Sequence, residues 1–443
     1  MDEQKPKSKS QWKRLNKKGI TRITVGGFKS IIEEKSIEVR PLTILAGANS
    51  SGKSGIMQPL LLLKQTLEAT YDPGVLLLNG PNVTFSSSDQ LLSHLNHGKF
   101  VEAFHIGIDV EMEETLTTYF RRSQNKGLDL EQTINSFEDQ KYRLYLDMPQ
   151  DEINQAFLST LSGIVQDTLG LNSKVVLTRN RCFYTLAVRN WDGSTFPVPM
   201  TSEDLIGSSI RQVIHLPGFR GNSERTYPVT SVGSEFPGTF DNYVASVIDQ
   251  WQKNDRNNKL IQVNRDLTRL GLTSKIVARR INDIQIELLI NRFLRSDKED
   301  MVNIVDAGLG VSQALSVVVA LQMAKSGQLV YIEQPEIYLH PRAQYVMAEI
   351  LADAIIEGKK LVIETHSSLL LRRVQTLVAE GKLPPELIKL HWFTLLEDGS
   401  TQISSADLDE TGAFGDWPED FHTVTLNSES RYLDAAEALL MGE

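Results

Sequence analysis

A strand that runs directly into a glycine-rich turn constrains the fold of this 443-residue chain more than any other feature. Residues 42–46 are apolar except for one threonine. The turn after them has the P-loop spacing G-x-x-x-x-G-K-S, made by Gly47, Gly52, Lys53 and Ser54. Glycines there let backbone N–H groups, including those of Asn49, Ser50 and Ser51, converge on phosphate, while the lysine reaches the outer phosphates and the serine joins a Mg²⁺ shell. The stretch therefore predicts a triphosphate site; a glycine turn without a ligand is the alternative.

The segment ahead of the P-loop predicts an N-terminal β-hairpin. Residues 20–25 alternate as a strand does, and a second strand is expected at residues 36–40. Phe28 and Lys29 lie between them and are candidates for contact with a nucleotide base and an α-phosphate. Core packing of the phenylalanine and a solvated lysine are the alternatives.

Composition and charge limit the class of protein. The net charge is −10, and the single cysteine, Cys182, excludes an internal disulfide framework and a cysteine-based zinc site. The chain shows neither a run of about 18 apolar residues nor a secretion signal, so we expect a cytoplasmic protein without a membrane span. Eight Lys or Arg residues fall within residues 1–22, which is typical of a nucleic-acid-binding arm or of a solvated, disordered leader.

The middle of the chain gives weaker signals. Residues 111–171 are polar and charged with a helix-like periodicity, and residues 174–191 are typical of a strand pair. We interpret residues 111–205 as an inserted, mostly helical subdomain. In the loop that follows, Arg220 and Arg225 are candidates for binding a phosphate of a nucleotide or a nucleic acid, with surface ion pairs as the alternative.

A second glycine-rich segment precedes a long apolar helix predicted at residues 314–324. Its candidate residues are Gly310, Ser312 and Gln313. Backbone N–H groups, a hydroxyl and the positive end of a helix dipole together suit a γ-phosphate. A glycine-rich helix cap accounts for the same residues equally well.

Two apolar strands further on end in charged residues. The strand at residues 328–332 runs into Glu333, Gln334 and Glu336. A carboxylate at the C-terminal end of a core strand is where a parallel α/β sheet places its ligand chemistry, so Glu333 is a candidate Mg²⁺ ligand.

The next helix and strand have clear boundaries. Pro341 opens a helix that Gly358 closes, and the strand at residues 360–363 follows. That strand ends in Glu364, and His366 can hydrogen-bond a γ-phosphate or an attacking water. A histidine satisfied within the core is the alternative.

In this order the motifs resemble the ABC-type ATPase heads of the OLD, RecF and SMC group, and most closely the bacterial AAA-family ATPases with a C-terminal domain of unknown function. Residues 20–65, 214–240 and 303–370 carry the resemblance, and residues 417–421 look like that family's tail. It implies an α/β fold of the P-loop NTPase type, with a mixed central sheet flanked by helices and an N-terminal antiparallel sheet. ATP and Mg²⁺ are the implied cofactors.

The resemblance also implies an arrangement of subunits and a set of roles. Two copies would form a head-to-tail homodimer, or a higher homo-oligomer, in which the Ser312 loop of one closes over nucleotide held by Lys53 of the other. Ser54 and Glu333 would hold the metal. The implied catalytic residues are Glu333, Gln334, Glu336 and His366.

One position departs from the family pattern. Gln334 stands where such heads usually have the glutamate that polarises the attacking water. A glutamine can orient water but cannot accept its proton, so we expect slow hydrolysis unless Glu336 or Glu364 substitutes.

These signals divide the chain into five expected regions. They are a basic disordered leader at 1–18, an N-terminal lobe with the P-loop at 19–110, an inserted α/β subdomain at 111–205, a C-terminal lobe at 206–395 and an acidic tail region at 396–443.

The resulting functional hypothesis is an ATP-dependent switch or clamp for a separately encoded effector, such as a nuclease or toxin, in bacterial anti-phage defence. A DNA-repair ATPase of the RecF or SMC kind, with bound nucleic acid, is one alternative. Another is an OLD-like nuclease, which requires a metal-binding Toprim domain; Asp407 and Asp409 form the sole Asp-x-Asp pair after His366. A nucleotide-locked scaffold with almost no turnover is the last.

Overall fold

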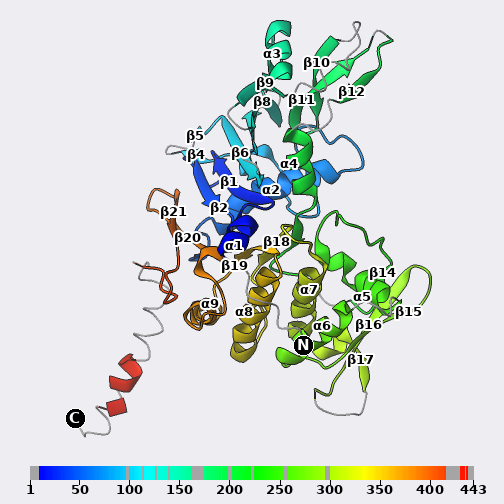
Figure 1. The fold of residues 1–443 in the computed structure, drawn as a ribbon, viewed down its shortest axis with the longest axis vertical. Helices are drawn as coiled ribbons and strands as arrows, with labels where there is room; N and C mark the ends of the chain where they lie inside the picture. The colour runs from blue at the N-terminus through cyan, green and yellow to red at the C-terminus, as the bar shows by residue number, and fades with distance from the viewer. Residues whose placement is uncertain are drawn as a thin grey trace.

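The computed structural model describes residues 9–95, 99–111, 114–124, 127–137, 140–160, 174–190, 192–197, 202–220, 224–253, 258–294, 300–415, 430–434 and 436–437. Within these residues the fold is mixed α/β and contains two six-stranded sheets (Figure 1). The mixed sheet with flanking helices that the sequence predicted is confirmed. Across the described part of the chain, every helix is too short or too polar to cross a membrane.

The central sheet places the ends of its parallel strands along one edge. In spatial order its strands are β13 (Ile214–Leu216), β18 (Leu329–Glu333), β19 (Lys360–Glu364), β3 (Leu42–Gly47), β20 (Ile388–Leu395) and β21 (Thr401–Ala406). The first five run parallel, and β21 pairs antiparallel with β20. The turns after β3, β13, β18 and β19 therefore emerge together, as in other open α/β sheets whose ligands bind at this edge.

Both faces of the central sheet are buried. Along β19, Leu361 and Ile363 belong to one apolar cluster and Val362 to the other, because successive side chains of a strand point to opposite faces. The first cluster includes α7 (Leu309–Met323) and α8 (Pro341–Ile356), and the second includes α2 (Lys53–Glu68).

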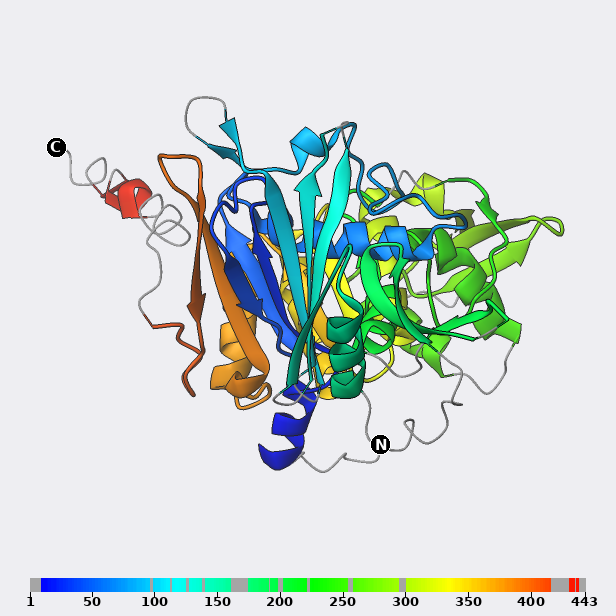
Figure 2. The same ribbon diagram turned by 90° about the horizontal axis from the view of Figure 1, so that it is seen from above.

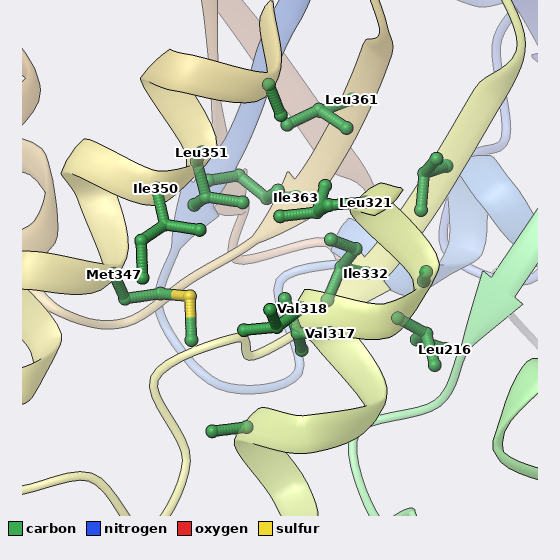
Figure 3. Packing of buried hydrophobic residues seen from close by; sticks show 14 of the residues in the cluster. Leu216, Val317, Val318, Leu321, Ile332, Met347, Ile350, Leu351, Leu361 and Ile363 are labelled. Atoms are coloured by element: carbon green, nitrogen blue, oxygen red, sulfur yellow. The ribbon is translucent and has the colours of Figure 1, made fainter. Parts of the chain in front are cut away.

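Side chains from two helices and three strands interlock in the first cluster. Figure 3 shows them close together: Val317, Val318 and Leu321 from α7, Met347, Ile350 and Leu351 from α8, and Leu216, Ile332, Leu361 and Ile363 from the sheet. Burying one such side chain contributes about 1.5–3 kcal/mol. This packing fixes the strand ends that carry the polar residues described below.

Helix α8 begins and ends as the sequence predicted. The side chain of His340 accepts a hydrogen bond from the N–H of Arg342, and Pro341 takes the first helical position. The chain leaves the helix through Gly358, whose φ is +102°. Helix α9 (Ser368–Ala379) then packs beside α8, as Figure 1 shows.

The second six-stranded sheet is antiparallel and contains the predicted N-terminal hairpin. Its order is β2 (Lys35–Glu38), β1 (Ile20–Gly26), β6 (Ala103–Val110), β7 (Glu114–Arg122), β8 (Leu128–Phe137) and β9 (Gln140–Tyr145). Figure 2 shows these blue and cyan strands side by side, with α2 crossing near them. Helix α2 contributes apolar side chains to the core that this sheet shares with the central sheet.

The expectation of a mostly helical insertion at 111–205 is wrong. Three of the antiparallel strands lie there, and β10 (Lys174–Asn180), β11 (Phe183–Arg189) and β12 (Thr195–Pro197) form a further sheet. Helices occur only as α3 (Gln150–Thr160) and α4 (Ser202–Arg211) among the described residues of this region. Residues 114–122 alternate with a period of two and are rich in threonine and aromatics, which favours a strand over a helix.

The expected leader and the expected tail region both contain regular structure among their described residues. Helix α1 (Lys9–Asn16) lies in the expected leader, and Trp12 is buried against the main core, because an indole gains more by packing than by hydration. Residues 1–8 lie outside the described residues. In the expected tail region β21 belongs to the central sheet, and residues 417–421 again lie outside the described residues.

A further group of elements forms a lobe beside α7. Helices α5 (Val244–Lys253) and α6 (Lys259–Arg269) pack there with a small sheet. Its strands are β14 (Tyr227–Pro228), β15 (Ile276–Arg280), β16 (Gln285–Asn291) and β17 (Met301–Asn303). Figure 1 shows this lobe and the β10–β12 sheet toward opposite ends of the molecule.

Candidate active site

A cavity of about 520 Å³ lies where the parallel strands of the central sheet end. The P-loop and the turns after β13, β18 and β19 enclose it. Its lining includes these predicted site residues: Lys29, Asn49, Ser50, Ser51, Gly52, Lys53, Ser54, Glu333, Gln334 and His366. It also includes Ser30, Gln58, Gly218, Phe219, Ile337 and Glu364, of which only Glu364 was singled out from the sequence.

The P-loop requires glycine at both of its fixed glycine positions. Gly47 has a φ of +142°, and a Cβ added there would lie 2.3 Å from the carbonyl oxygen of Phe393. Gly52 has a φ of +95°, and an added Cβ would lie 2.3 Å from Oγ1 of Thr401. Any side chain would therefore combine backbone strain with a clash.

Lys53 is the first residue of α2 and turns back over the loop. Its ammonium donates hydrogen bonds to the carbonyl oxygens of Gly47 at 3.0 Å and Ala48 at 2.6 Å. Burial lowers the pKa of Lys53, and the charge of Glu364 partly opposes that shift. The ammonium is thus held at the cavity by neutral partners, which phosphate oxygens can replace.

Ser54 and the end of β19 form a buried polar cluster. The Ser54 hydroxyl donates to Oε2 of Glu364 at 3.0 Å, and the Tyr331 hydroxyl makes a short hydrogen bond to Oε1. Burial, followed by the charge of Glu333 on the neighbouring strand, raises the pKa of Glu364 to about 7. Glu364 therefore lies between the two expected metal ligands, Ser54 and Glu333.

Glu333 is ionised and held in place from β13. Its Oε1 lies 3.3 Å from Nε2 of His215, and its Oε2 accepts a hydrogen bond of 3.0 Å from the N–H of Gly218. Burial opposes ionisation, but the hydrogen bond and charge of His215 and the Gly218 N–H outweigh it, so the pKa of Glu333 is lowered. Nδ1 of His215 lies 3.1 Å from Oδ1 of Asn82, which fixes the imidazole from its other side.

The residues at the cavity fit a magnesium-bound nucleotide. The hydroxyl of Ser54 and the carboxylate of Glu333 are oxygen donors, which Mg²⁺ prefers. The glycine cradle of the P-loop leaves backbone N–H groups accessible where a Cβ cannot fit. Together with the Lys53 ammonium, these groups can balance the charge of a triphosphate.

Gln334 has a constrained backbone. Its φ is +47°, its N–H donates to the carbonyl oxygen of Glu364 at 2.8 Å, and its side chain lines the cavity. A non-glycine residue in this conformation carries strain of about 1–3 kcal/mol and persists only where its surroundings hold it. The backbone of Gln334 is therefore held in place beside the cavity that its side chain lines.

His366 and Glu336 have different surroundings. His366 lines the cavity, and burial and then the charge of Lys53 lower its pKa, so its imidazole is neutral at pH 7. Glu336 is buried outside the lining, and its Oε1 accepts hydrogen bonds from Oγ1 of Thr365 at 2.7 Å and the N–H of His366 at 3.0 Å. These contacts hold the turn that presents His366, so the placement of Glu336 does not support the expected catalytic role.

The candidate role of Phe28 as a base contact is wrong. Its ring is fully buried and packs edge-on against Phe85 and Phe104, because the turn after β1 points the ring into the core. Lys29 does line the cavity. Its ammonium donates to Oε1 of Gln58 at 2.6 Å, and burial lowers its pKa.

Gly310, Ser312 and Gln313 lie in the first turn of α7, away from this cavity. None of them is among its lining residues. Gly310 is required where the helix meets the turn after β18, since an added Cβ would lie 2.9 Å from the carbonyl oxygen of Tyr338. Within one chain these residues do not share the cavity with Lys53, so their nucleotide-binding role stays a prediction that depends on a second copy.

The two arginines of the loop after β13 have different surroundings. Arg225 forms an exposed ion pair with Asp306, which was the alternative interpretation. Arg220 is buried and donates to the carbonyl oxygens of Glu333 and Gln334. This contact with the turn at residues 333–336, called the acidic turn below, could not be predicted from the sequence, because it depends on the pairing of β13 with β18.

One part of the chain matches a known family model. Residues 234–371 match the family model described as AAA ATPase domain. This match covers about a third of the chain and supports the ATPase expected from the motifs. A search of curated proteins gives no match.

Solved structures that match this chain include three heads of SMC proteins. One is an SMC head bound to the C-terminal winged-helix domain of ScpA, with 11% identity, a TM-score of 0.46, and coverage of 88% of this chain and 98% of that chain. The SMC head domain from Thermotoga maritima has 11% identity, a TM-score of 0.39, and coverage of 87% and 98%. An Smc head with an extended coiled coil, bound to the C-terminal domain of ScpA derived from Pyrococcus furiosus, has 9% identity, a TM-score of 0.45, and coverage of 88% and 96%.

Proposed function

We propose that this protein binds ATP with Mg²⁺ in the cavity at the P-loop, hydrolyses it slowly, and uses ATP-dependent pairing of two copies as a switch for a partner protein. The observation that carries the proposal is the gathering of Lys53, Ser54, Glu333, Gln334 and His366 around one cavity. These residues come from three separate strand ends and have the charges that a metal-bound triphosphate needs.

Each residue at the cavity has a role that follows from its contacts. Bound Mg²⁺-ATP supplies an activated phosphoanhydride and the cation that neutralises it. Lys53 exchanges the carbonyl oxygens of Gly47 and Ala48 for phosphate oxygens, and Ser54 and Glu333 hold the metal. The neutral imidazole of His366 can donate a hydrogen bond to a terminal phosphate or to water.

Slow hydrolysis follows from the amide at position 334. The side chain of Gln334 can orient a water but cannot take its proton. Glu364 lines the cavity and has a raised pKa, but it already accepts hydrogen bonds from Ser54 and Tyr331. Neither group is free to act as an efficient general base, which lengthens the time the nucleotide stays intact.

Pairing of two copies would complete the site. The first turn of α7 lies outside the cavity of its own chain. Two exposed side chains lie there: Leu309, the first residue of the helix, is 38% accessible, and Tyr338, in the neighbouring turn, is 54% accessible. In a head-to-tail pair, Ser312 of one copy would cap nucleotide held by Lys53 of the other. To shift a pairing equilibrium from 1:99 to 99:1, the nucleotide must favour the closed state by about 5.5 kcal/mol.

The partner of such a switch is proposed from family resemblance alone. It would be a separately encoded effector, such as a nuclease or toxin, acting in the cytoplasm in bacterial anti-phage defence. No group of three or more His, Cys, Asp or Glu side chains suited to a metal occurs among the residues that the structure describes. The second candidate, a DNA-repair clamp, differs in requiring nucleic acid for its function.

ATP turnover and particle mass test the proposal together. Wild type should hydrolyse ATP slowly and double its mass when ATP and Mg²⁺ are added, whereas Lys53→Ala should do neither. Lys382→Ala removes an exposed lysine, 62% accessible, and serves as the matched control. A wild-type mass that ignores ATP would contradict the switch, and DNA-stimulated turnover would favour the repair clamp.

A further inference from the structure

One buried arginine connects the two parts of the site that lie apart. Arg220 follows β13 and is only 5% exposed. Its Nη2 donates to the carbonyl oxygens of Glu333 at 2.8 Å and Gln334 at 3.2 Å. Its Nη1 lies 3.4 Å from Oε1 of Gln313, in the first turn of α7. A single guanidinium therefore contacts both the acidic turn and the start of the helix.

Backbone hydrogen bonds strengthen this connection. Oε1 of Gln313 also accepts from the N–H of Arg220 at 3.3 Å, and Nε2 of Gln313 donates to the Arg220 carbonyl at 3.0 Å. Gln313 is 1% exposed and follows Ser312 directly in the chain. A shift of Ser312 along the helix axis must therefore carry Gln313, and with it Arg220.

The other end of the connection is a strained residue. The left-handed backbone of Gln334 is held on its N–H side by the carbonyl of Glu364 and on its carbonyl side by Arg220. A conformation of this kind needs contacts on both sides to persist. Arg220 thus holds the backbone of a residue that lines the cavity.

The charge of Arg220 is retained despite its burial. Burial lowers its pKa to about 10, and the charges of Glu336, Glu333 and Asp241 oppose the shift. Removing the guanidinium would leave these carboxylates without a compensating charge. The side chain is suited to this place because its planar guanidinium presents donors in a fixed fork, whereas a lysine ammonium is a compact charge with no such fixed geometry.

We propose that Arg220 is a positioning residue that transmits the position of the α7 start, and so of Ser312, to the backbone of Glu333 and Gln334. The inference rests on the proposed function and adds a route of regulation to it. Nucleotide of a partner copy that binds Ser312 would move Gln313 and Arg220, and thereby align Gln334 in the cavity of its own chain. Hydrolysis then depends on the state of the pair rather than on nucleotide binding alone.

Arg220→Lys tests this coupling because it keeps the charge and removes the fork of donors. ATP affinity and ATP-dependent pairing should remain within about twofold of wild type, since Lys53 and Ser54 are untouched, whereas kcat should fall about 10- to 100-fold because Gln334 is misplaced. Arg279→Lys changes an exposed arginine, 64% accessible and paired with Glu287, and is the matched control.

A second variant approaches the connection from α7. Gln313→Asn keeps the amide but shortens its reach, and it should lower kcat to a similar extent. In the double variant the two losses should not multiply, since both break one connection. A melting curve shows whether Arg220→Lys folds. If it does not fold, Gln313→Asn alone tests the coupling: kcat should fall while ATP affinity stays unchanged.

The outcomes separate this inference from the proposed function. Wild type that fails to bind ATP would overturn both. Wild type that binds and hydrolyses ATP, while Arg220→Lys or Gln313→Asn keeps full kcat, would overturn the coupling alone. Parallel losses of kcat, ATP affinity and melting temperature would also overturn it, because they indicate a general structural role.

Discussion

Gln334→Glu should increase the rate of ATP hydrolysis, since it places a general base at the position now held by an amide. The substitution keeps the length of the side chain and the left-handed backbone of this residue. A general base typically raises the rate about 10²–10⁴-fold, which corresponds to lowering the activation free energy by about 3–5 kcal/mol. This range is the upper bound for the expected gain.

The surroundings of residue 334 reduce that gain. A new carboxylate would share the cavity with Glu333 and Glu364, and like charges at close range disfavour joint ionisation. Glu364, whose pKa is already raised to about 7, would take up a proton first and relieve part of the repulsion. We therefore expect turnover to rise by about 10- to 100-fold, at or below the lower end of that range.

Steady-state phosphate release at saturating ATP measures this effect. Gln155→Glu adds the same charge on the exposed face of α3, far from the cavity, and should leave turnover unchanged. An unchanged or lower rate for Gln334→Glu would refute the reasoning and indicate that another residue, with Glu364 the first candidate, already serves as base.

Two further predictions concern the neighbours of the P-loop. Thr401 Oγ1 donates a hydrogen bond to the carbonyl oxygen of Ser51 in the P-loop at 3.0 Å. Thr401→Val should therefore weaken ATP binding about 5- to 10-fold, and Thr401→Ser, which keeps the hydroxyl, should bind as wild type does. Equal binding by wild type and both variants in a titration would contradict this role. Because the pKa of Glu364 is raised from 4.5 in the unfolded chain to about 7, the folded state binds more protons, and stability should fall by about 3 kcal/mol as pH rises from 4.5 through 7. Glu364→Gln should flatten this loss in chemical denaturation between pH 5 and 8, and an identical slope in both forms would count against it.

Local signals in the sequence predicted much of the fold that positions the site. The P-loop glycines, the proline and glycine that bound α8, and the apolar runs of β18 and β19 each reflect short-range geometry. Their order then predicted that Lys53, Glu333 and His366 would meet. Strand pairing in parallel sheets is non-local, which is why the contacts of His215, Gly218 and Arg220 with the end of β18 were not predicted.

The predictions that were wrong also failed for physical reasons. In residues 114–145 a high content of charged residues concealed the period-two alternation of three strands, one face of which packs in the core. Phe28 is adjacent to Lys29 in the chain, yet consecutive side chains at this turn point to the core and to the cavity. The pKa of Glu364 depends on its burial beside Glu333, which only the folded sheet creates.

The central claim is that the P-loop cavity holds ATP with magnesium, and equilibrium binding of a fluorescent ATP analogue tests it most directly. Wild type should bind saturably and more tightly with Mg²⁺ than without it, and Lys53→Ala should lose nearly all affinity while Lys382→Ala keeps it. Absence of binding by wild type, or equal binding by Lys53→Ala, would contradict the account.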